Sequence, residues 1–119
     1  MKRLFIIDDD TDILESLGIW FTKKGFEVDL FSLPEPMLDA LQTTSPGLIL
    51  MDVNLKNDDG RIICKELKEN NKAKCPILLF SANPFVLKDY KDYLADGAIA
   101  KPFSLKEITN VISSFTESV

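Results

Sequence analysis

The 119-residue sequence contains no histidine and only two cysteines. Without histidine the chain cannot form a Ser-His-Asp or Cys-His catalytic arrangement or a histidine-ligated zinc site, and it cannot carry a phosphoryl group on an imidazole. Two cysteines in a reducing compartment, Cys64 and Cys75 here, are expected to be small apolar residues rather than redox groups. Histidine-dependent catalysis, histidine-ligated zinc and phosphohistidine chemistry are therefore excluded, and cysteine redox chemistry is disfavoured.

An excess of basic residues and long apolar runs are also missing. The chain has 14 Lys and Arg against 19 Asp and Glu, a formal net charge of -5. Because nucleic acids and anionic membranes attract basic surfaces, we expect this chain to bind neither directly. No apolar run approaches the roughly 20 residues that a membrane-spanning helix needs. The apolar run near the N-terminus is too short for a secretion signal, so we expect a cytoplasmic protein.

Short apolar runs that end in polar residues dominate what is present. Residues 48–52, for example, are four apolar residues followed by Asp52, the pattern of a strand buried on both faces. Such strands alternate with helical patterns five times, which predicts an α/β fold with a parallel sheet and helices on both faces, in one domain spanning 1–119. Strands are expected at 4–7, 28–31, 48–52, 76–80 and 98–100, and helices beginning near residues 11, 33, 60, 84 and 105.

Helix boundaries are marked by local capping signals. Thr11 is the expected N-cap of the first helix, and Ser32 and Ser104 each begin a Ser-x-x-Glu capping box. Asn83 and the proline after it predict the start of a fourth helix that runs through Leu94. The acids at 58 and 59 are expected to lie in a solvated loop.

Polar residues follow the predicted strands at the point where each ends. Because parallel strands bring their carboxyl ends to one edge, where such sheets bind ligands, we expect these side chains to meet. Close carboxylates raise one another's pKa, and a hard divalent cation such as Mg²⁺ relieves the repulsion. A carboxylate beside a cation, a lysine and a hydroxyl can accept a phosphoryl group. The converging residues are Asp8, Asp9, Asp52, Asn54, Ser81 and Lys101.

Four motifs at these strand ends occur in a familiar order: Ile6-Ile7-Asp8-Asp9, Leu50-Met51-Asp52, Ser81-Ala82 and Lys101-Pro102-Phe103. Together they resemble the receiver domain of bacterial two-component response regulators, over essentially all 119 residues. The resemblance implies a doubly wound, flavodoxin-like sheet in the order 2-1-3-4-5. It also implies a phosphorelay switch rather than an enzyme acting on a free substrate, with no output domain in this chain.

The resemblance implies a phosphoacceptor and two groups that contact its phosphoryl group. Asp52 would accept phosphate from a sensor histidine kinase or a phosphotransfer protein. Ser81 would turn toward the acyl phosphate and Lys101 would pair with it, aided by a cis peptide bond before Pro102. Phosphorylation would then switch the surface around the fourth helix and fifth strand, which controls a partner or an output domain.

The resemblance also implies a metal site. Asp9 and Asp52 would bind Mg²⁺ through their side chains, Asn54 through its backbone carbonyl and Asp8 through water, and Mn²⁺ could substitute. Asn54 and Asn83, each two residues after a site residue, stand where the family tunes the lifetime of the acyl phosphate.

The sequence departs from the family pattern in three places. Lys56 stands near a position that is usually proline, and Ala98 stands where the family has an aromatic switch residue. The segment 81–101 is also a couple of residues short, which predicts a trimmed or redrawn fourth helix. Tyr90 or Tyr93 could take over the role of the missing ring.

Several alternatives remain open. A receiver that has lost switching would be a phosphorylation-independent interaction module, which Ala98 and the short segment favour and the intact acids oppose. An aspartyl phosphatase of the haloacid-dehalogenase type would need threonine where Asp12 stands, and a flavodoxin would have its phosphate repelled by the acids after the first strand. A calcium loop is excluded by Ile13 and Ile19. The sequence leaves open the target and a phosphorylation-dependent homodimer.

Overall fold

The computed structural model describes residues 2–116. Five strands form one sheet, and two very short strands form a separate hairpin. In chain order the elements are β1 (Arg3–Ile7), α1 (Thr11–Lys23), β2 (Glu27–Phe31), α2 (Pro34–Ala40), β3 (Leu48–Asp52), β4 (Asn54–Leu55), β5 (Asp58–Asp59), α3 (Gly60–Glu69), β6 (Ile77–Ser81), the 3₁₀ turns η1 (Pro84–Leu87) and η2 (Tyr90–Tyr93), β7 (Gly97–Ala100) and α4 (Leu105–Thr116).

The main sheet is parallel throughout, in the order β2-β1-β3-β6-β7. This is the expected order 2-1-3-4-5 once the β4–β5 hairpin is left out of the numbering. The register pairs Ile7 with Met51 and Asp52 with Phe80, so neighbouring strands end at nearly the same level. The predicted fold class is confirmed, and the strand ends share one edge.

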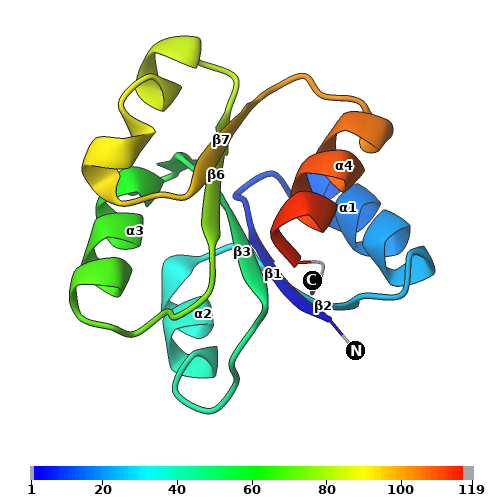
Figure 1. Cartoon of the computed structure of the whole chain (residues 1–119), viewed down its shortest axis with the longest axis horizontal. Helices are drawn as coiled ribbons and strands as arrows, with labels where there is room; N and C mark the ends of the chain where they lie inside the picture. Colours follow the sequence, from blue (N-terminus) through cyan, green and yellow to red (C-terminus); the bar gives the residue numbers. More distant parts are fainter. Residues whose placement is uncertain (1, 117–119) are drawn as a thin grey trace.

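Helices cover both faces of the sheet, as Figure 1 shows: α1 and α4 on one face, α2 and α3 on the other. Alternate residues of β3 pack into the two hydrophobic cores, one on each face of the sheet. Leu48 and Leu50 pack in the core beneath α1 and α4, whereas Ile49 and Met51 pack in the core beneath α2 and α3. Every residue of β3 is buried, as its unbroken apolar run predicted.

Two of the predicted helix caps are wrong and one is confirmed in part. Asp10, not Thr11, caps α1, because its carboxylate accepts hydrogen bonds from the N–H groups of residues 12 and 13. At α2 the cap position falls on Leu33, which makes no side-chain cap bond, because the proline after it holds Leu33 extended and leaves Ser32 one residue too early. Ser104 Oγ does accept the N–H of Glu107, at 3.0 Å.

The predicted fourth helix does not form. Asn83 caps the segment as expected, since its Oδ1 accepts the N–H of Phe85 at 3.0 Å, but the segment then makes only the 3₁₀ turns η1 and η2. Asp89 leaves the helical conformation between the two turns. The second turn ends at Leu94, which lies in the left-handed region with φ 63°. The short connection between β6 and β7 is thus redrawn, in line with the shortened segment seen in the sequence.

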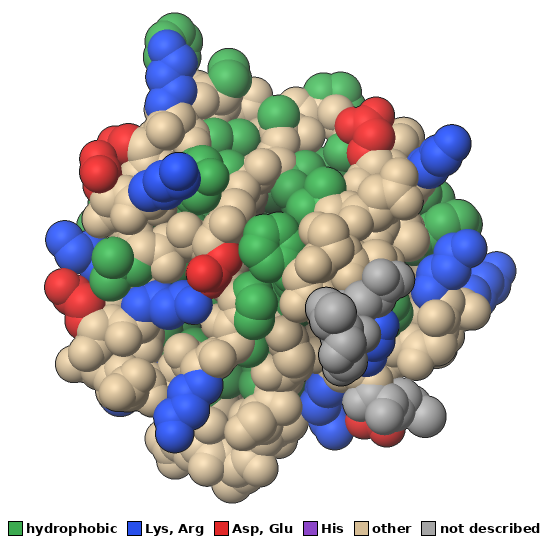
Figure 2. Space-filling view, in the orientation of Figure 1, with side chains coloured by type: hydrophobic (Ala, Val, Ile, Leu, Met, Phe, Trp, Pro, Cys, Tyr) green, Lys and Arg blue, Asp and Glu red, His purple; other side chains and the backbone are tan. Residues whose placement is uncertain are grey.

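The surface on the β7 side is mixed in character. In Figure 2 apolar side chains gather along the middle of this face, between α4 and the 3₁₀ turns, and charged side chains of both signs lie beside them and around the rim. None of the helices within residues 2–116 is long and apolar enough to cross a membrane.

Candidate functional site

Three carboxylates meet at the carboxyl edge of the sheet. Asp8 and Asp9 follow β1 and Asp52 ends β3, its neighbour, so the parallel register places them side by side. Each offers one carboxylate oxygen, and these oxygens all lie within 4.8 Å of one another. Asp8 is 0% exposed and Asp52 is 4% exposed. Two of the three acids are therefore largely removed from water, where a charge is costly unless it is balanced.

Lys101 supplies the positive charge at this edge. Its backbone N–H donates to Ser81 O at 2.8 Å, which positions the lysine just beyond β7. Its Nζ then lies 3.0 Å from Asp8 Oδ2 and 3.4 Å from Asp52 Oδ2. The ammonium also lies 4.4 Å from the centroid of the Phe80 ring, a favourable cation–π distance. The Lys101-Pro102 peptide bond is cis, as expected.

Backbone N–H groups hold the other carboxylate oxygens. Asp8 Oδ1 accepts from the N–H of Asp10 at 2.9 Å, and Asp52 Oδ1 accepts from the N–H of Asn54 at 3.2 Å. Each of these two acids therefore has one oxygen fixed by its own loop and one turned to Lys101. Such fixed rotamers are what a preorganised site requires.

The charges of the cluster do not balance. Burial raises the pKa of Asp8, and the neighbouring Asp52 raises it further, while the N–H of Asp10 and the ammonium of Lys101 oppose the rise. One ammonium faces three carboxylates, so Lys101 alone leaves an excess of negative charge. Converging carboxylate oxygens are hard donors of the kind that Mg²⁺ prefers. The donor set, the spacing and the charge deficit all fit a divalent cation.

Ser81 and the two asparagines lie at the same edge. Ser81 ends β6 and is fully buried, and its Oγ accepts the N–H of Asn83 at 3.1 Å. That bond uses an acceptor site of the hydroxyl and leaves its proton available to donate. The backbone N–H of Asn54 donates a hydrogen bond to Asp52 Oδ1, and Asn54 is otherwise exposed.

Gly60 packs directly against the strand that ends in Asp52. Its N–H donates to Val53 O at 2.8 Å. A Cβ at this position would collide with the carbonyl oxygen of Asp52 and lie 3.0 Å from its carbonyl carbon. Only glycine allows this close approach of two backbones, which places the start of α3 against the phosphoacceptor candidate.

The residues considered for switching lie apart from the acids. Tyr90 and Ala98 are half-buried against the core beneath α2 and α3. The ring of Tyr93 lies 4.9 Å from the guanidinium carbon of Arg61, a residue of α3 that the sequence did not single out. Arg61 was detectable only as a cation following an Asp-Gly helix start, which is a weak signal.

Asp59 is not a solvated loop acid, contrary to the sequence-based expectation. It is the N-cap of α3 and accepts the N–H of Arg61 at 2.9 Å. Arg61 Nη2 also lies 2.8 Å from Asp59 Oδ2, and this guanidinium lowers the pKa of Asp59. Asp59 and Arg61 therefore form one partly shielded unit at the start of α3.

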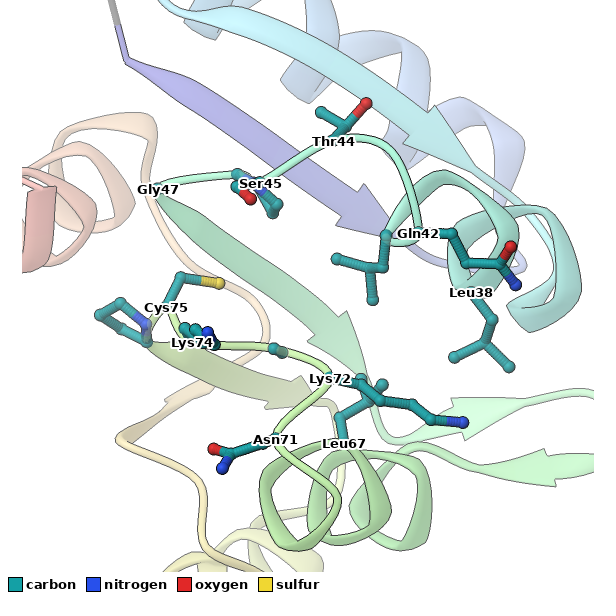
Figure 3. A pocket seen from close by; sticks show the side chains of 14 residues that line it. Leu38, Gln42, Thr44, Ser45, Gly47, Leu67, Asn71, Lys72, Lys74 and Cys75 are labelled. Atoms are coloured by element: carbon teal, nitrogen blue, oxygen red, sulfur yellow. The ribbon is translucent and has the colours of Figure 1, made fainter.

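A cavity of about 700 Å³ lies at the opposite edge of the sheet, near the amino ends of β3 and β6 (Figure 3). Leu38 and Leu67 form apolar parts of its wall, and Lys72 and Lys74 are its charged lining residues. It lies where α2 and α3 end. The cavity is therefore remote from the acid cluster.

Comparison with known proteins assigns the family. The model of the response regulator receiver domain matches residues 4–113. The alkaline phosphatase synthesis transcriptional regulatory protein PhoP of Bacillus subtilis is 31% identical over 112 residues, which cover 90% of this chain and 45% of PhoP. The probable transcriptional regulator ycf27 of Cyanophora paradoxa is 30% identical over 119 residues, covering 95% of this chain and 47% of ycf27.

Solved structures agree with this assignment. The putative response regulator of Chloroflexus aurantiacus superposes with a TM-score of 0.88 at 25% identity, covering 97% of each chain. TrrA of Thermotoga maritima, a response regulator solved with Mg²⁺ and BeF, has the same fold with a TM-score of 0.86 at 23% identity, covering 97% of this chain and 99% of TrrA. The chain spans about half the length of the curated relatives it matches. It belongs to the response regulator receiver domain family of two-component signalling.

Proposed function

We propose that this receiver domain is a switch controlled by phosphorylation of Asp52. The supporting observation is the placement of Asp52, whose carboxylate shares one edge with two further acids and lies 3.4 Å from the Lys101 ammonium. Asp52 is the acid that ends the central strand β3, with a backbone donor on its other oxygen. This geometry holds a carboxylate ready to act as a nucleophile beside a fixed positive charge.

In the proposed reaction an oxygen of Asp52 bonds to phosphorus while the bond from phosphorus to the imidazole nitrogen of a partner's phosphohistidine breaks. The released imidazole carries the electron pair of that bond and takes up a proton from solvent. Lys101 offsets the charge on the phosphoryl oxygens and the Ser81 hydroxyl donates a hydrogen bond to one of them. Water later hydrolyses the acyl phosphate, at a rate that the side chains of Asn54 and Asn83 tune.

The residues that would hold Mg²⁺ are Asp9 and Asp52 by their side chains, Asn54 by its carbonyl and Asp8 through water. The bound cation, or Mn²⁺ in its place, would neutralise charge on the phosphoryl oxygens. The support is the cluster of three carboxylate oxygens within 4.8 Å of one another and its unbalanced charge.

The phosphodonor would be a sensor histidine kinase or a phosphotransfer protein. An apolar hollow of about 420 Å³ lies beside Lys101, between α1 and the start of α4, and Leu17 and Phe103 line it. An apolar surface next to the acceptor suits the docking of a donor helix. The downstream target would contact the surface around the 3₁₀ turns and β7, and the transcriptional regulators among the relatives make a DNA-binding output domain one such target.

Labelling by a small phosphodonor tests the acceptor. Incubation with acetyl phosphate and Mg²⁺, followed by intact-mass spectrometry, should show one added phosphoryl group in the wild type and none in Asp52→Asn. The control is Asp58→Asn, which removes an exposed acid of the nearby β4–β5 hairpin and should label like the wild type. Stoichiometric labelling of Asp52→Asn would overturn the assignment.

A second candidate is an interaction module that no longer switches. It is favoured by Ala98, which provides no ring, and by the replacement of the expected helix with η1 and η2. Beryllofluoride, a phosphate mimic, separates the two functions. A switch should shift amide resonances beyond the site at saturating Mg²⁺, whereas an unchanged spectrum would favour the module.

A further inference from the structure

A continuous series of contacts leads from Asp52 to the redrawn segment 84–94. The first contact is the hydrogen bond of 3.2 Å from the N–H of Asn54 to Asp52 Oδ1. Asn54 belongs to β4 and pairs with Asp59 of β5 across the hairpin. Asp52 is therefore linked to the hairpin, and through the hairpin to Asp59.

Asp59 connects the hairpin to Arg61. The guanidinium lies against both carboxylate oxygens, with Nε 3.1 Å from Oδ1 and Nη2 2.8 Å from Oδ2. The two side chains are 21% and 30% exposed, so the pair is partly shielded from water. A fork of this kind fixes the plane of the guanidinium as well as its position.

Arg61 in turn holds the second 3₁₀ turn. Its guanidinium carbon lies 4.9 Å from the centroid of the Tyr93 ring, which is half-buried. The side chain of Arg61 thus joins the start of α3 to η2. Ala98, the position of the family's switch aromatic, provides no comparable side chain.

The hairpin and the 3₁₀ segment both store backbone strain. Lys56, in the hairpin, has φ 45°, and Leu94, at the end of η2, has φ 63°. The left-handed region is unfavourable for a residue with a side chain, so tertiary contacts must hold each residue there. A segment kept in place against its local preference is easily displaced when such a contact is lost.

We propose that Arg61 is the positioning residue that couples the state of Asp52 to segment 84–94, through Asp59 on one side and Tyr93 on the other. The coupling rests on the proposed phosphorylation of Asp52. In the unphosphorylated protein Arg61 holds the segment against α3. Phosphorylation adds about -1.5 to -2 charge at Asp52 and changes the acceptor of the Asn54 N–H. The hairpin moves, the guanidinium leaves the Tyr93 ring and the segment is released.

The first test concerns the unphosphorylated protein. The amides of Asp92, Leu94 and Ala95 donate to carbonyl groups of segment 84–94, so their hydrogen exchange reports how firmly the segment is held. Arg61→Gln should speed their exchange about two- to fivefold, because the cation–π contact with the Tyr93 ring is lost. The control Lys65→Gln removes the same charge from an exposed position of α3 and should leave exchange unchanged. Equal exchange in the two variants would overturn the proposal.

The second test adds beryllofluoride and Mg²⁺ and follows backbone amide resonances. In the wild type the amides of 52–54, 81–83 and 84–94 should all shift. In Arg61→Gln the resonances of 52–54 and 81–83 should still shift. Those of 84–94 should already lie, before beryllofluoride is added, near the positions that they take in the wild type with beryllofluoride, and should then move little. A full response of 84–94 in Arg61→Gln would overturn the coupling alone.

The remaining outcomes separate coupling from simple packing and from the proposed function. Tyr93→Phe keeps the ring and should transmit like the wild type, whereas Tyr93→Leu should behave like Arg61→Gln. If the amides of 84–94 no longer shifted in Tyr93→Phe, the coupling could not depend on the contact between Arg61 and the face of the ring. An absence of shifts at 52–54 and 81–83 in every variant would overturn the proposed function, and the coupling that rests on it.

Discussion

The ammonium of Lys101 lies 3.0 Å from the Oδ2 atom of Asp8, a carboxylate with no exposed surface. This contact is shorter than the 3.4 Å between the same ammonium and Asp52 Oδ2. Before any phosphoryl group arrives, Lys101 is therefore primarily the counter-ion of a buried acid. Its pairing with a phosphoryl group on Asp52 would require only a small movement within the same cluster.

Replacing Lys101 with methionine should destabilise the metal-free protein. The change leaves buried carboxylates without their cation, and breaking such a pair costs about 3–5 kcal/mol. Urea unfolding without Mg²⁺ measures the loss, and added Mg²⁺ should recover part of it because a bound cation offsets the same charges. Lys88→Met, at an exposed lysine over the Phe85 ring, should change stability by less than about 1 kcal/mol. Equal losses in the two variants would contradict the role given to Lys101.

Asp8→Asn should have the opposite effect in metal-free buffer. Burial raises the pKa of Asp8 in the folded state above its usual value of 3.8. The contribution of Asp8 to the free energy of unfolding is thus fully present below the pKa of Asp8 in the unfolded chain. It is lost as pH rises through the pKa of Asp8 in the folded protein. Near neutral pH the neutral amide should therefore raise the melting temperature by a few degrees and flatten its dependence on pH.

The same variant should respond less to Mg²⁺. Wild-type protein gains stability from any cation that binds only the folded state, and the asparagine weakens that site. Thermal melts from about pH 4 to 8, with and without Mg²⁺, measure both effects. Asp58→Asn, at an exposed acid, should keep the wild-type pattern. A metal-free melting temperature below that of the wild type at neutral pH would contradict the burial argument.

Gly60→Ala should damage both stability and phosphorylation. The added methyl meets backbone atoms, lying 3.1 Å from Val53 Cα as well as against the Asp52 carbonyl, and backbone cannot rotate away. Overpacking of this kind costs about 1–3 kcal/mol and would shift the acceptor. Gly47→Ala is the matched control, since its Cβ would meet only Arg3 O at an ordinary 3.5 Å. Urea unfolding and acetyl phosphate labelling should both separate the two variants.

The sheet and its acidic edge could be predicted because they depend on strong, local signals. An unbroken apolar run such as residues 48–51 indicates a strand buried on both faces, and parallel strands align the polar residues at their ends. Asp8, Asp9 and Asp52 therefore met as expected. The metal, the phosphoacceptor role of Asp52 and the roles of Ser81, Lys101, Asn54 and Asn83 stay predictions.

Features decided by tertiary contacts or by a single residue were missed or predicted only in part. The shortened segment indicated a trimmed or redrawn fourth helix, but not the two 3₁₀ turns that replace it. The contact between Arg61 and the Tyr93 ring joins residues far apart in the sequence, so no local pattern indicates it. The strands of the β4–β5 hairpin have two residues each, which is too few to show the alternation of apolar and polar residues that predicts a strand. The cap of α2 was misplaced because Pro34 restricts the residue before it, which outweighs the capping preference of Ser32.

The two cysteines should behave as buried apolar residues. Cys64 is 0% exposed, and burial raises the pKa of its thiol to about 12, while burial also raises the pKa of Cys75. Because the thiolate is the reactive form, iodoacetamide at about pH 8 should label Cys64 only as fast as the protein opens. In Cys75→Ser, which leaves a single thiol, the labelling rate should rise with urea in step with unfolding.

The sign of the pH effect gives a second check on Cys64. Its folded pKa lies above the ordinary value of 9.0, so the unfolded chain loses the thiol proton first. Stability should therefore fall as pH rises from the ordinary pKa of the thiol toward its pKa in the folded protein. Cys64→Ala should remove this part of the loss of stability at alkaline pH. Cys64→Ala also leaves a small cavity, which lowers stability at every pH and so does not imitate the change in slope. Rapid alkylation of native protein would instead indicate an accessible thiol and contradict the buried placement.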